Sequence, residues 1–163
     1  MPGGPPLRVA LVCLALALTT AGCSGGRSAA SSPVHVQPPA AGTAQRAACR
    51  ALERALPRTL EHLQARPTTP TSGLTAAWGD PPVVLRCGVG LPAGFTTGAS
   101  LTQVNDVAWF QQVVDARVLW TTVDRITQVE LTVPTSYDGQ GAFLVDLADP
   151  IKRSLPLQAQ QPR

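Results

Sequence analysis

The chain has 163 residues, of which 44% are hydrophobic, 14% charged and 4% aromatic. This apolar content is too high for a chain that is disordered throughout, and the length is that of one ordinary domain. The formal net charge of +3, from 13 Lys and Arg against 10 Asp and Glu, is too small for the electrostatic footprint of a nucleic-acid-binding protein.

The first 22 residues have the three zones of a secretory signal peptide. Arg8 is the one positive side chain before an apolar run over residues 9–18, and small residues follow at 19–22. A helix of these 10 residues would be about 15 Å long, roughly half the hydrocarbon thickness of a bilayer, so the run is too short to span a membrane. We expect residues 1–22 to be an export signal.

The end of this segment, Thr20-Ala21-Gly22-Cys23, resembles the lipobox of bacterial lipoproteins. The resemblance implies that the Cys23 thiol carries a diacylglyceryl group and that the signal is cleaved before Cys23. A lipobox usually has Leu where this chain has Thr20. Two acyl chains would hold the protein on the outer face of the cell membrane. The alternative is cleavage by the ordinary signal peptidase, which would leave Cys23 unmodified and the protein secreted.

The region after the signal divides into a tether, a domain and a tail. Residues 24–42 are mostly Ser, Gly, Ala and Pro, so they cannot bury enough surface to fold. We therefore expect residues 23–42 to be the lipidated cysteine and a disordered tether, in which His35 is solvated. Residues 43–155 are expected to form a single extracytoplasmic domain, and residues 156–163 a flexible tail. Between residues 47 and 150, 7 Arg face 10 acids, a net charge of about −3.

A helix is predicted at the start of the domain, with Thr43 as its cap. Apolar residues follow the helical spacing, and Pro57 then interrupts the backbone hydrogen bonding. These apolar positions are Ala48, Cys49, Leu52, Ala55 and Leu56. Leu60 and Leu63 then belong to a kinked continuation or to a separate turn. His62 lies on the polar side of that continuation, where a structural or surface role is expected rather than a catalytic one.

Six segments have the composition of β-strands: residues 74–78, 83–89, 101–104, 107–112, 117–123 and 126–133. Residues 79–82, Gly-Asp-Pro-Pro, predict a stiff turn between the first two. Asn105-Asp106 and Asp124-Arg125 fit tight hairpin connections. In the last strand Val129, Leu131 and Val133 alternate with polar residues, which is typical of a half-buried strand.

A second helical pattern occupies residues 135–155, where Pro150 is expected to split or end the helix early. Its apolar residues are Phe143, Leu144, Leu147, Ile151 and Leu155. The sequence therefore predicts an α+β domain, in which an amino-terminal and a carboxy-terminal helix flank an antiparallel sheet of five or six strands and cover one of its faces.

One disulfide is expected. Removal of the signal eliminates Cys13, and lipidation occupies Cys23, which leaves Cys49 and Cys87. Both lie on apolar faces of elements that should pack together, and an exported protein meets an oxidising compartment. The competing interpretation is a reactive or metal-binding pair of thiols, but no His-rich or acidic cluster accompanies either cysteine.

Several sequence blocks resemble a family of actinobacterial envelope proteins known only as a domain of unknown function. The blocks are residues 48–52 (ACRAL), 55–57 (ALP), 77–89 (AWGDPPVVLRCGV), 129–134 (VELTVP) and 144–148 (LVDLA). Together they cover nearly all of the expected domain. The ratio of 12 Arg to 1 Lys is compatible with a GC-rich genome of such a source. The resemblance implies a lipoprotein or membrane protein without an established activity, and it transfers no catalytic residues.

The leading functional hypothesis is a non-catalytic envelope lipoprotein that binds another surface protein or a wall component. Trp78, Asp80 and Arg86 place an aromatic ring, an anion and a cation around one turn, which makes them a candidate binding face. The alternative is that Trp78 packs the hairpin, Asp80 binds turn amides and Arg86 is solvated.

The rival class is an envelope hydrolase with a carboxylate-based site. Such an enzyme needs a nucleophile with a base, or two carboxylates across a cleft. The candidates Asp106, Asp115, Asp124, Glu130 and Asp138 occur singly at turns or on outward strand positions. No catalytic or nucleotide-binding motif is present, and no cofactor or metal is expected.

Overall fold

The structure is a computed structural model that describes residue 1 and residues 32–159. The expected signal peptide, Cys23 and the first part of the expected tether lie outside the described residues. In chain order the elements are β1 (Val34–His35), α1 (Thr43–Ala55), β2 (Thr59–Leu60), β3 (Leu63–Arg66), β4 (Thr68–Thr69), β5 (Thr75–Trp78), β6 (Val83–Val89), β7 (Thr102–Val104), β8 (Val107–Val114), β9 (Arg117–Thr122), β10 (Gln128–Pro134) and α2 (Ala142–Ser154).

Eight strands form one antiparallel sheet in the order β2-β3-β5-β6-β10-β9-β8-β7. The central strands β6 and β10 have the clearest alternation, and Val129, Leu131 and Val133 are completely buried on one face. All six expected strands are present, so the α+β class is confirmed. The expected number of five or six strands is wrong, because β2 and β3 extend the sheet and β1 pairs with β4 in a separate two-stranded sheet.

The hairpin of β2 and β3 replaces the helix continuation that was one of the two expectations after Pro57. Helix α1 ends at Ala55, and Leu60 pairs with Leu63 across a two-residue turn. Glu61 and His62 form this turn with φ of 51° and 79°, the left-handed conformation that tight hairpins require. Neither residue is Gly or Asn, so the turn carries no sequence signal. The Glu61 N–H donates to Asp146 Oδ2 at 3.0 Å, which ties the turn to α2.

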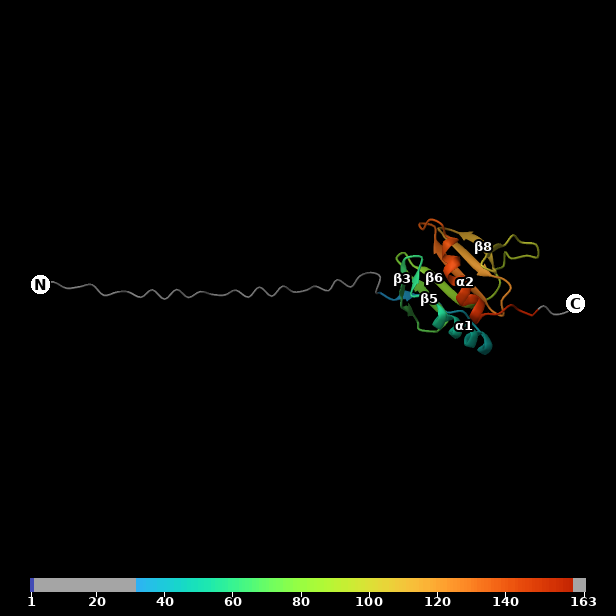
Figure 1. Ribbon diagram of the computed structural model, residues 1–163, viewed down its shortest axis with the longest axis horizontal. Coiled ribbons are helices and arrows are strands. Elements are labelled where there is room, and N and C mark those ends of the chain that lie inside the picture. Colours follow the sequence, from blue (N-terminus) through green and yellow to red (C-terminus); the bar gives the residue numbers. More distant parts are fainter. Residues whose placement is uncertain (2–31, 160–163) are drawn as a thin grey trace.

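Both helices pack on the same face of the sheet and against each other (Figure 1). Leu52 of α1 and Leu144, Leu147 and Ile151 of α2 have no exposed surface, and they share one core with the buried side chains of the central strands. Helix α1 begins one residue after its cap, Gly42, whose N–H donates to Gln45 Oε1 at 2.9 Å. The expected cap, Thr43, is therefore the first helical residue.

Helix α2 continues through Pro150 to Ser154, so the expectation that Pro150 splits or shortens it is wrong. A proline lacks the N–H that would bind the carbonyl four residues earlier. The residues around it compensate, because Leu147, Ala148, Ile151 and Leu155 are completely buried against the sheet and α1. Packing therefore holds the last turn of the helix despite one missing hydrogen bond.

The described chain before α1, residues 32–41, lies on the domain; we call it the amino-terminal segment. The Val34 N–H donates to Pro67 O at 2.8 Å and the Val36 N–H to Thr69 O at 3.0 Å. Val36 and Ala41 are buried. At Gly88, whose φ is +96°, a Cβ atom would lie 2.8 Å from the Ala41 Cβ. The expected disorder up to residue 42 is therefore wrong for this part. Backbone hydrogen bonds and close packing order these residues, although their composition is poor in large apolar side chains.

The expected tail is also held in part. The Ile126 N–H donates to Pro156 O at 3.0 Å, and the Gln158 N–H to Asp124 O at 2.9 Å. This pairing occupies the connection before β10, which begins at Gln128, so the tight hairpin expected at Asp124-Arg125 is not formed. The other expected hairpin is confirmed: Asn105 and Asp106 join β7 to β8 with φ of 46° and 64°.

Candidate binding groove on the sheet

The predicted disulfide is confirmed. The Sγ atoms of Cys49 and Cys87 are 2.05 Å apart and join α1 to β6. Both cysteines are completely or almost completely buried in the core. A structural disulfide of this kind is typical of proteins that fold in an oxidising compartment, so it favours an extracytoplasmic location.

Trp78, Asp80 and Arg86 do not form one binding face. In the register of β5 and β6, Trp78 lies opposite Val83, whereas Arg86 lies opposite Thr75. Successive residues of a strand point to opposite faces, so Val83 and Arg86, three positions apart, are on different faces. Trp78 therefore points to the side of the helices and Arg86 to the other side. The sequence-based grouping of these three residues is wrong.

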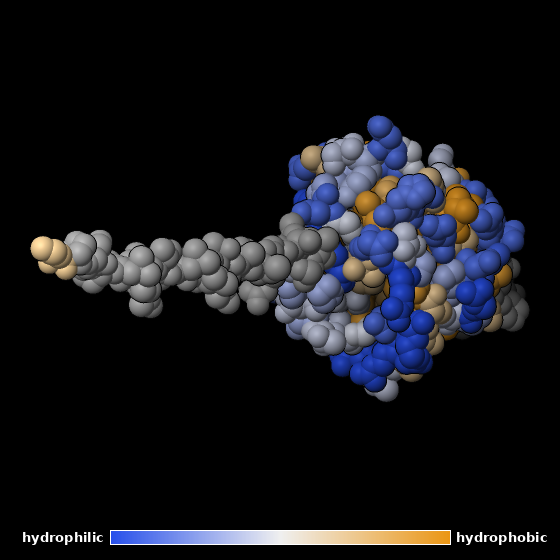
Figure 2. Space-filling view, turned by 60° about the vertical axis from the view of Figure 1, so that its left-hand side comes forward, coloured by the Kyte–Doolittle hydropathy of each residue, from blue (hydrophilic) through white to orange (hydrophobic). Residues whose placement is uncertain are grey.

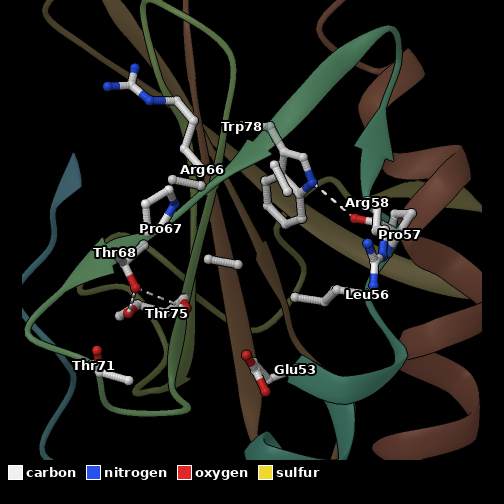
Figure 3. A pocket seen from close by; sticks show the side chains of 13 residues that line it. Glu53, Leu56, Pro57, Arg58, Arg66, Pro67, Thr68, Thr71, Thr75 and Trp78 are labelled. Atoms are coloured by element: carbon white, nitrogen blue, oxygen red, sulfur yellow. Dashed lines mark hydrogen bonds between the residues drawn. The ribbon is translucent and has the colours of Figure 1, made fainter. Parts of the chain in front are cut away.

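Trp78 lines a cleft of about 310 Å³ between the end of α1, β4 and β5 (Figure 3). Its Nε1 donates to Pro57 O at 3.0 Å, and only 1% of the residue is exposed. Figure 3 shows the indole near Leu56 and Pro57, with the hydroxyls of Thr68 and Thr75 across the cleft. Because its ring faces are covered, Trp78 cannot offer them for stacking, and its role is to pack the hairpin, as one alternative had it.

Asp80 lies at the turn between β5 and β6, where Arg66 reaches it. The Arg66 Nη1 is 3.6 Å from Asp80 Oδ1 and donates to Gly79 O at 2.8 Å. The Nη2 of Arg66 donates to Ser32 O at 2.9 Å, so the same guanidinium also holds the amino-terminal segment. From the other side, the Tyr137 hydroxyl donates to Pro81 O at 2.7 Å. Burial, and secondly the negative charge of Asp80, raise the pKa of Tyr137.

Arg86 lies in a second hollow, of about 360 Å³, which we call the sheet-face groove. This groove lies on the face of the sheet opposite the helices, and the amino-terminal segment forms part of its wall. Its lining residues are His35, Val36, Gln37, Val84, Arg86, Val114, Arg117, Leu119, Glu130 and Thr132. The first three belong to the amino-terminal segment, and the others come from β6, β10, β9 and β8, four neighbouring strands, so the groove runs across the sheet.

An ion pair lies in the sheet-face groove. Arg86 Nε donates to Glu130 Oε1 at 3.0 Å, and the two residues are cross-strand partners on β6 and β10. The side chain of Arg86 is 35% exposed and that of Glu130 14% exposed. Arg117, the first residue of β9, adds a second guanidinium with a 57% exposed side chain. Two cations therefore face one carboxylate within the groove.

The sequence identified Arg86 but missed its surroundings. Glu130 was assigned to a solvated outward position, and His35 to a disordered tether. No short-range signal could have joined them, because Arg86 and Glu130 are 44 residues apart and meet only through the register of β6 and β10. Along β6, Val84 and Arg86 alternate with the buried residues Val83, Leu85 and Cys87, so the two share the outward face.

Two of the other candidate carboxylates, those of Asp106 and Asp124, lie near different cations. Asp106 Oδ2 is 3.8 Å from Lys152 Nζ, and Asp124 Oδ1 is 3.3 Å from Arg125 Nε. Within residues 32–159, no group of three or more His, Cys, Asp or Glu is arranged to hold a metal ion. No helix in this described part is long and apolar enough to cross a membrane.

The sequence of residues 7–160 matches a family described as "Protein of unknown function (DUF3515)". The chain belongs to this family. No curated protein and no solved structure matches the chain. The DUF3515 assignment confirms the resemblance to a domain of unknown function and covers the whole described domain, but it brings no activity, so a function has to be argued from the geometry.

Proposed function

We propose that this DUF3515 protein is a lipid-anchored, extracytoplasmic and non-catalytic binding protein of the cell envelope, which receives its partner in the sheet-face groove. The observation that carries the proposal is the groove itself. It has the volume of a ligand pocket, and it lies on the face of the sheet that the helices leave free. Its lining side chains are mostly half-buried or exposed, so they are available for contact without opening the core.

The proposed location rests on the signal-like residues 1–22, the lipobox-like Cys23 and the disulfide. Cys23 precedes Ser32, the first residue fixed on the domain by Arg66, by nine positions. Nine residues span at most about 30 Å, so a lipid on Cys23 would keep the domain close to the membrane surface. The groove would lie near that surface, because the amino-terminal segment forms part of its wall.

Binding rather than hydrolysis is proposed because the groove is lined by a single carboxylate, which is held in an ion pair. Glu130 is the acid among the lining residues, and Arg86 neutralises it at 3.0 Å. Two-carboxylate chemistry needs a second acid across the cleft, and Glu130 has no such partner among the lining residues. The carboxylate-based hydrolase remains the alternative, but no observation in the described residues favours it.

The anchor is tested by mass spectrometry of the mature amino terminus and by fractionation of cells. We expect a diacylglyceryl-modified Cys23 as the first residue, and Cys23→Ala should move the protein from the membrane to the soluble or secreted fraction. Cys13→Ala is the matched control, because the expected cleavage removes that residue, and it should leave the distribution unchanged. An unmodified terminus, or a Cys23→Ala variant still in the membrane fraction, would refute the anchor.

The binding role is tested by crosslinking in intact cells and recovery of the crosslinked neighbours. The double variant Arg86→Gln with Arg117→Gln removes both cations of the groove, and we expect it to lose at least one neighbour that the native protein recovers. Arg153→Gln, an exposed change at the end of α2, is the control and should retain that neighbour. Equal recovery of every neighbour by all three proteins would exclude the groove as the binding surface.

A further inference from the structure

We propose that the ligand of the sheet-face groove is an extended acidic peptide segment, and that Arg117 and Arg86 each bind one of its carboxylates. The inference rests on the proposed function, because it assigns a ligand class to the same groove. The charge of the groove, its mixed lining and its dimensions lead to it.

The charge of the groove is opposite to that of the surrounding domain. Residues 47–150 carry 7 Arg against 10 acids, yet the groove is lined by Arg86 and Arg117 against Glu130 alone. Only the Nε of Arg86 is engaged by Glu130, and its two terminal nitrogens have no protein partner within residues 32–159. A guanidinium with free terminal nitrogens presents the planar fork that matches a carboxylate.

Arg117 is equally available. Its closest acid, Asp115, is 4.0 Å away, and the two side chains are 57% and 83% exposed. An ion pair this long and this exposed contributes little free energy, so a ligand carboxylate can replace it at small cost. Arg117 is on β9, two strands from Arg86 on β6, so the two cations occupy separate positions in the groove.

The mixed lining favours a peptide over a polyanion. Glu130 lies beside Arg86, where its carboxylate would repel a chain of phosphates but can accept hydrogen bonds from peptide N–H groups. Val84 and Leu119 provide half-buried apolar contacts, and Thr132 lies between them in sequence register on β10. A peptide offers N–H groups, apolar side chains and a carboxylate together, which is the combination that this lining requires.

The dimensions fit a short peptide segment. The groove crosses β6, β10, β9 and β8, and neighbouring strands are about 4.8 Å apart, which makes its floor about 14 Å long. An extended peptide rises about 3.3 Å per residue, so the floor accommodates about four residues. The face of the domain shown in Figure 2 is mainly hydrophilic, with hydrophobic surface in separate small areas, so the domain does not rely there on a broad apolar contact.

The test is a titration of the mature protein, isolated from cells and held in detergent micelles, followed by methyl NMR. The probe is the tetrapeptide Ala-Glu-Val-Asp as a free acid, and its control is Ala-Gln-Val-Asn with an amidated carboxy terminus. The methyl groups of Val84, Val114 and Leu119 report on the groove. Val145, exposed on α2 on the other side of the sheet, is the reference.

We expect the acidic peptide to shift the groove methyls and not Val145, with weaker binding at higher salt. Arg117→Gln should raise its dissociation constant at least about tenfold, the loss expected for one charge-assisted hydrogen bond. Arg153→Gln should leave the dissociation constant unchanged. The uncharged peptide should bind at least about tenfold more weakly than the acidic one.

Three results would overturn the ligand class. Equal affinity for the uncharged peptide would show that the groove binds peptides without using the carboxylate. Tighter binding of inorganic phosphate or of a phosphate oligomer would replace the peptide by a phosphate ligand. Groove methyls that do not respond to the acidic peptide would overturn the inference, and if crosslinking in cells still depended on Arg86 and Arg117, the proposed binding function would stand without it.

Discussion

Arg125 shows how one side chain can hold separate parts of this fold together. It is only 4% exposed, and its Nη2 donates to Asp106 O in the turn between β7 and β8. Its Nη1 donates to Leu155 O, 3.4 Å away at the end of α2. A buried charge needs partners, and here two carbonyl oxygens accept hydrogen bonds, while Asp124 Oδ1 lies 3.3 Å from the Arg125 Nε without a hydrogen bond between them. The sequence indicated only a turn at this position, because these partners come from distant segments.

Tyr137 offers a direct test of the environment at the turn between β5 and β6. It is the single tyrosine of the chain, so the ultraviolet absorbance of tyrosinate reports on this residue alone. Burial and then the negative charge of Asp80 raise its pKa above 10.0, although Arg66 opposes the shift. We expect the folded protein to titrate with a midpoint above 10.0 and the urea-unfolded protein to titrate near 10.0.

The raised pKa also sets a direction for stability. The fold favours the neutral phenol, so this contribution to the free energy of unfolding is fully present below pH 10 and is lost as the pH rises through the folded pKa. Asp80→Asn should lower the absorbance midpoint of the folded protein, whereas Asp138→Asn should leave it in place. A midpoint that Asp80→Asn does not lower would contradict the assigned role of Asp80.

At the scale of elements, six strands could be predicted from the sequence, whereas β3 and the two-residue strands could not. Residues 128–134 alternate between buried and half-buried positions over the whole strand, and residues 83–87 do so over most of β6; this period is visible in the sequence. The strands β1, β2 and β4 have two residues each, too few for a period. They are strands because a neighbour in space provides hydrogen bonds, as Pro67 and Thr69 do for the amino-terminal segment.

The sheet-face groove could not be predicted from the sequence for the same reason. Each strand that lines it was expected, but its ion pair depends on the pairing of β6 with β10, and its wall on the amino-terminal segment. Strand order and register are long-range properties, whereas the sequence pattern is local. The outward position of Arg86 could therefore be predicted, but its contact with Glu130 could not.

The amino-terminal segment gives a prediction at this scale. Val36 is its buried apolar side chain next to β1, with 6% exposure. Replacing Val36 by Ser removes apolar contacts and places a hydroxyl in a buried position, so we expect the segment to open more often. Hydrogen exchange should become at least about tenfold faster at the amides of Val34 and Val36, which corresponds to a loss of about 1.4 kcal/mol in the local free energy of opening.

The control is His35→Ser, because His35 is exposed and its side chain does not hold the segment in place. Exchange in the central strand β10 should be the same in both variants and in the native protein. Faster exchange in β10 with Val36→Ser would show that the segment and the sheet unfold as one unit, which would contradict a locally attached segment.

At the scale of the whole molecule, the α+β class, the helices at both ends and the disulfide followed from composition, periodicity and the number of cysteines. The sequence did not predict that the face of the sheet opposite the helices would carry a groove. The helices pack on one face of the sheet (Figure 1), and the groove lies on the other face. Substitutions in the groove should therefore affect binding more than folding.

The disulfide gives the prediction for the whole molecule. It closes a loop between residues separated by 38 positions, and in the chain-entropy model such a cross-link stabilises the fold by about 4 kcal/mol. Cys49→Ala with Cys87→Ala should lower the free energy of unfolding by about this amount, measured by urea denaturation. The native disulfide should also resist reductant until urea is added, because both cysteines are buried. Rapid reduction of the folded protein would contradict this burial.

The covalent link between α1 and β6 also determines how the domain would respond to mechanical force. A pull applied at Ser32 acts first on the two residue pairs of β1 with β4, which can peel away one after the other. From Cys49 the tension passes directly through the bonded sulfurs to Cys87 in the middle of the sheet. The stretch of chain between the two cysteines would then carry no load. A pulling force from the membrane would detach the amino-terminal segment at the edge of the groove and leave the rest of the domain folded.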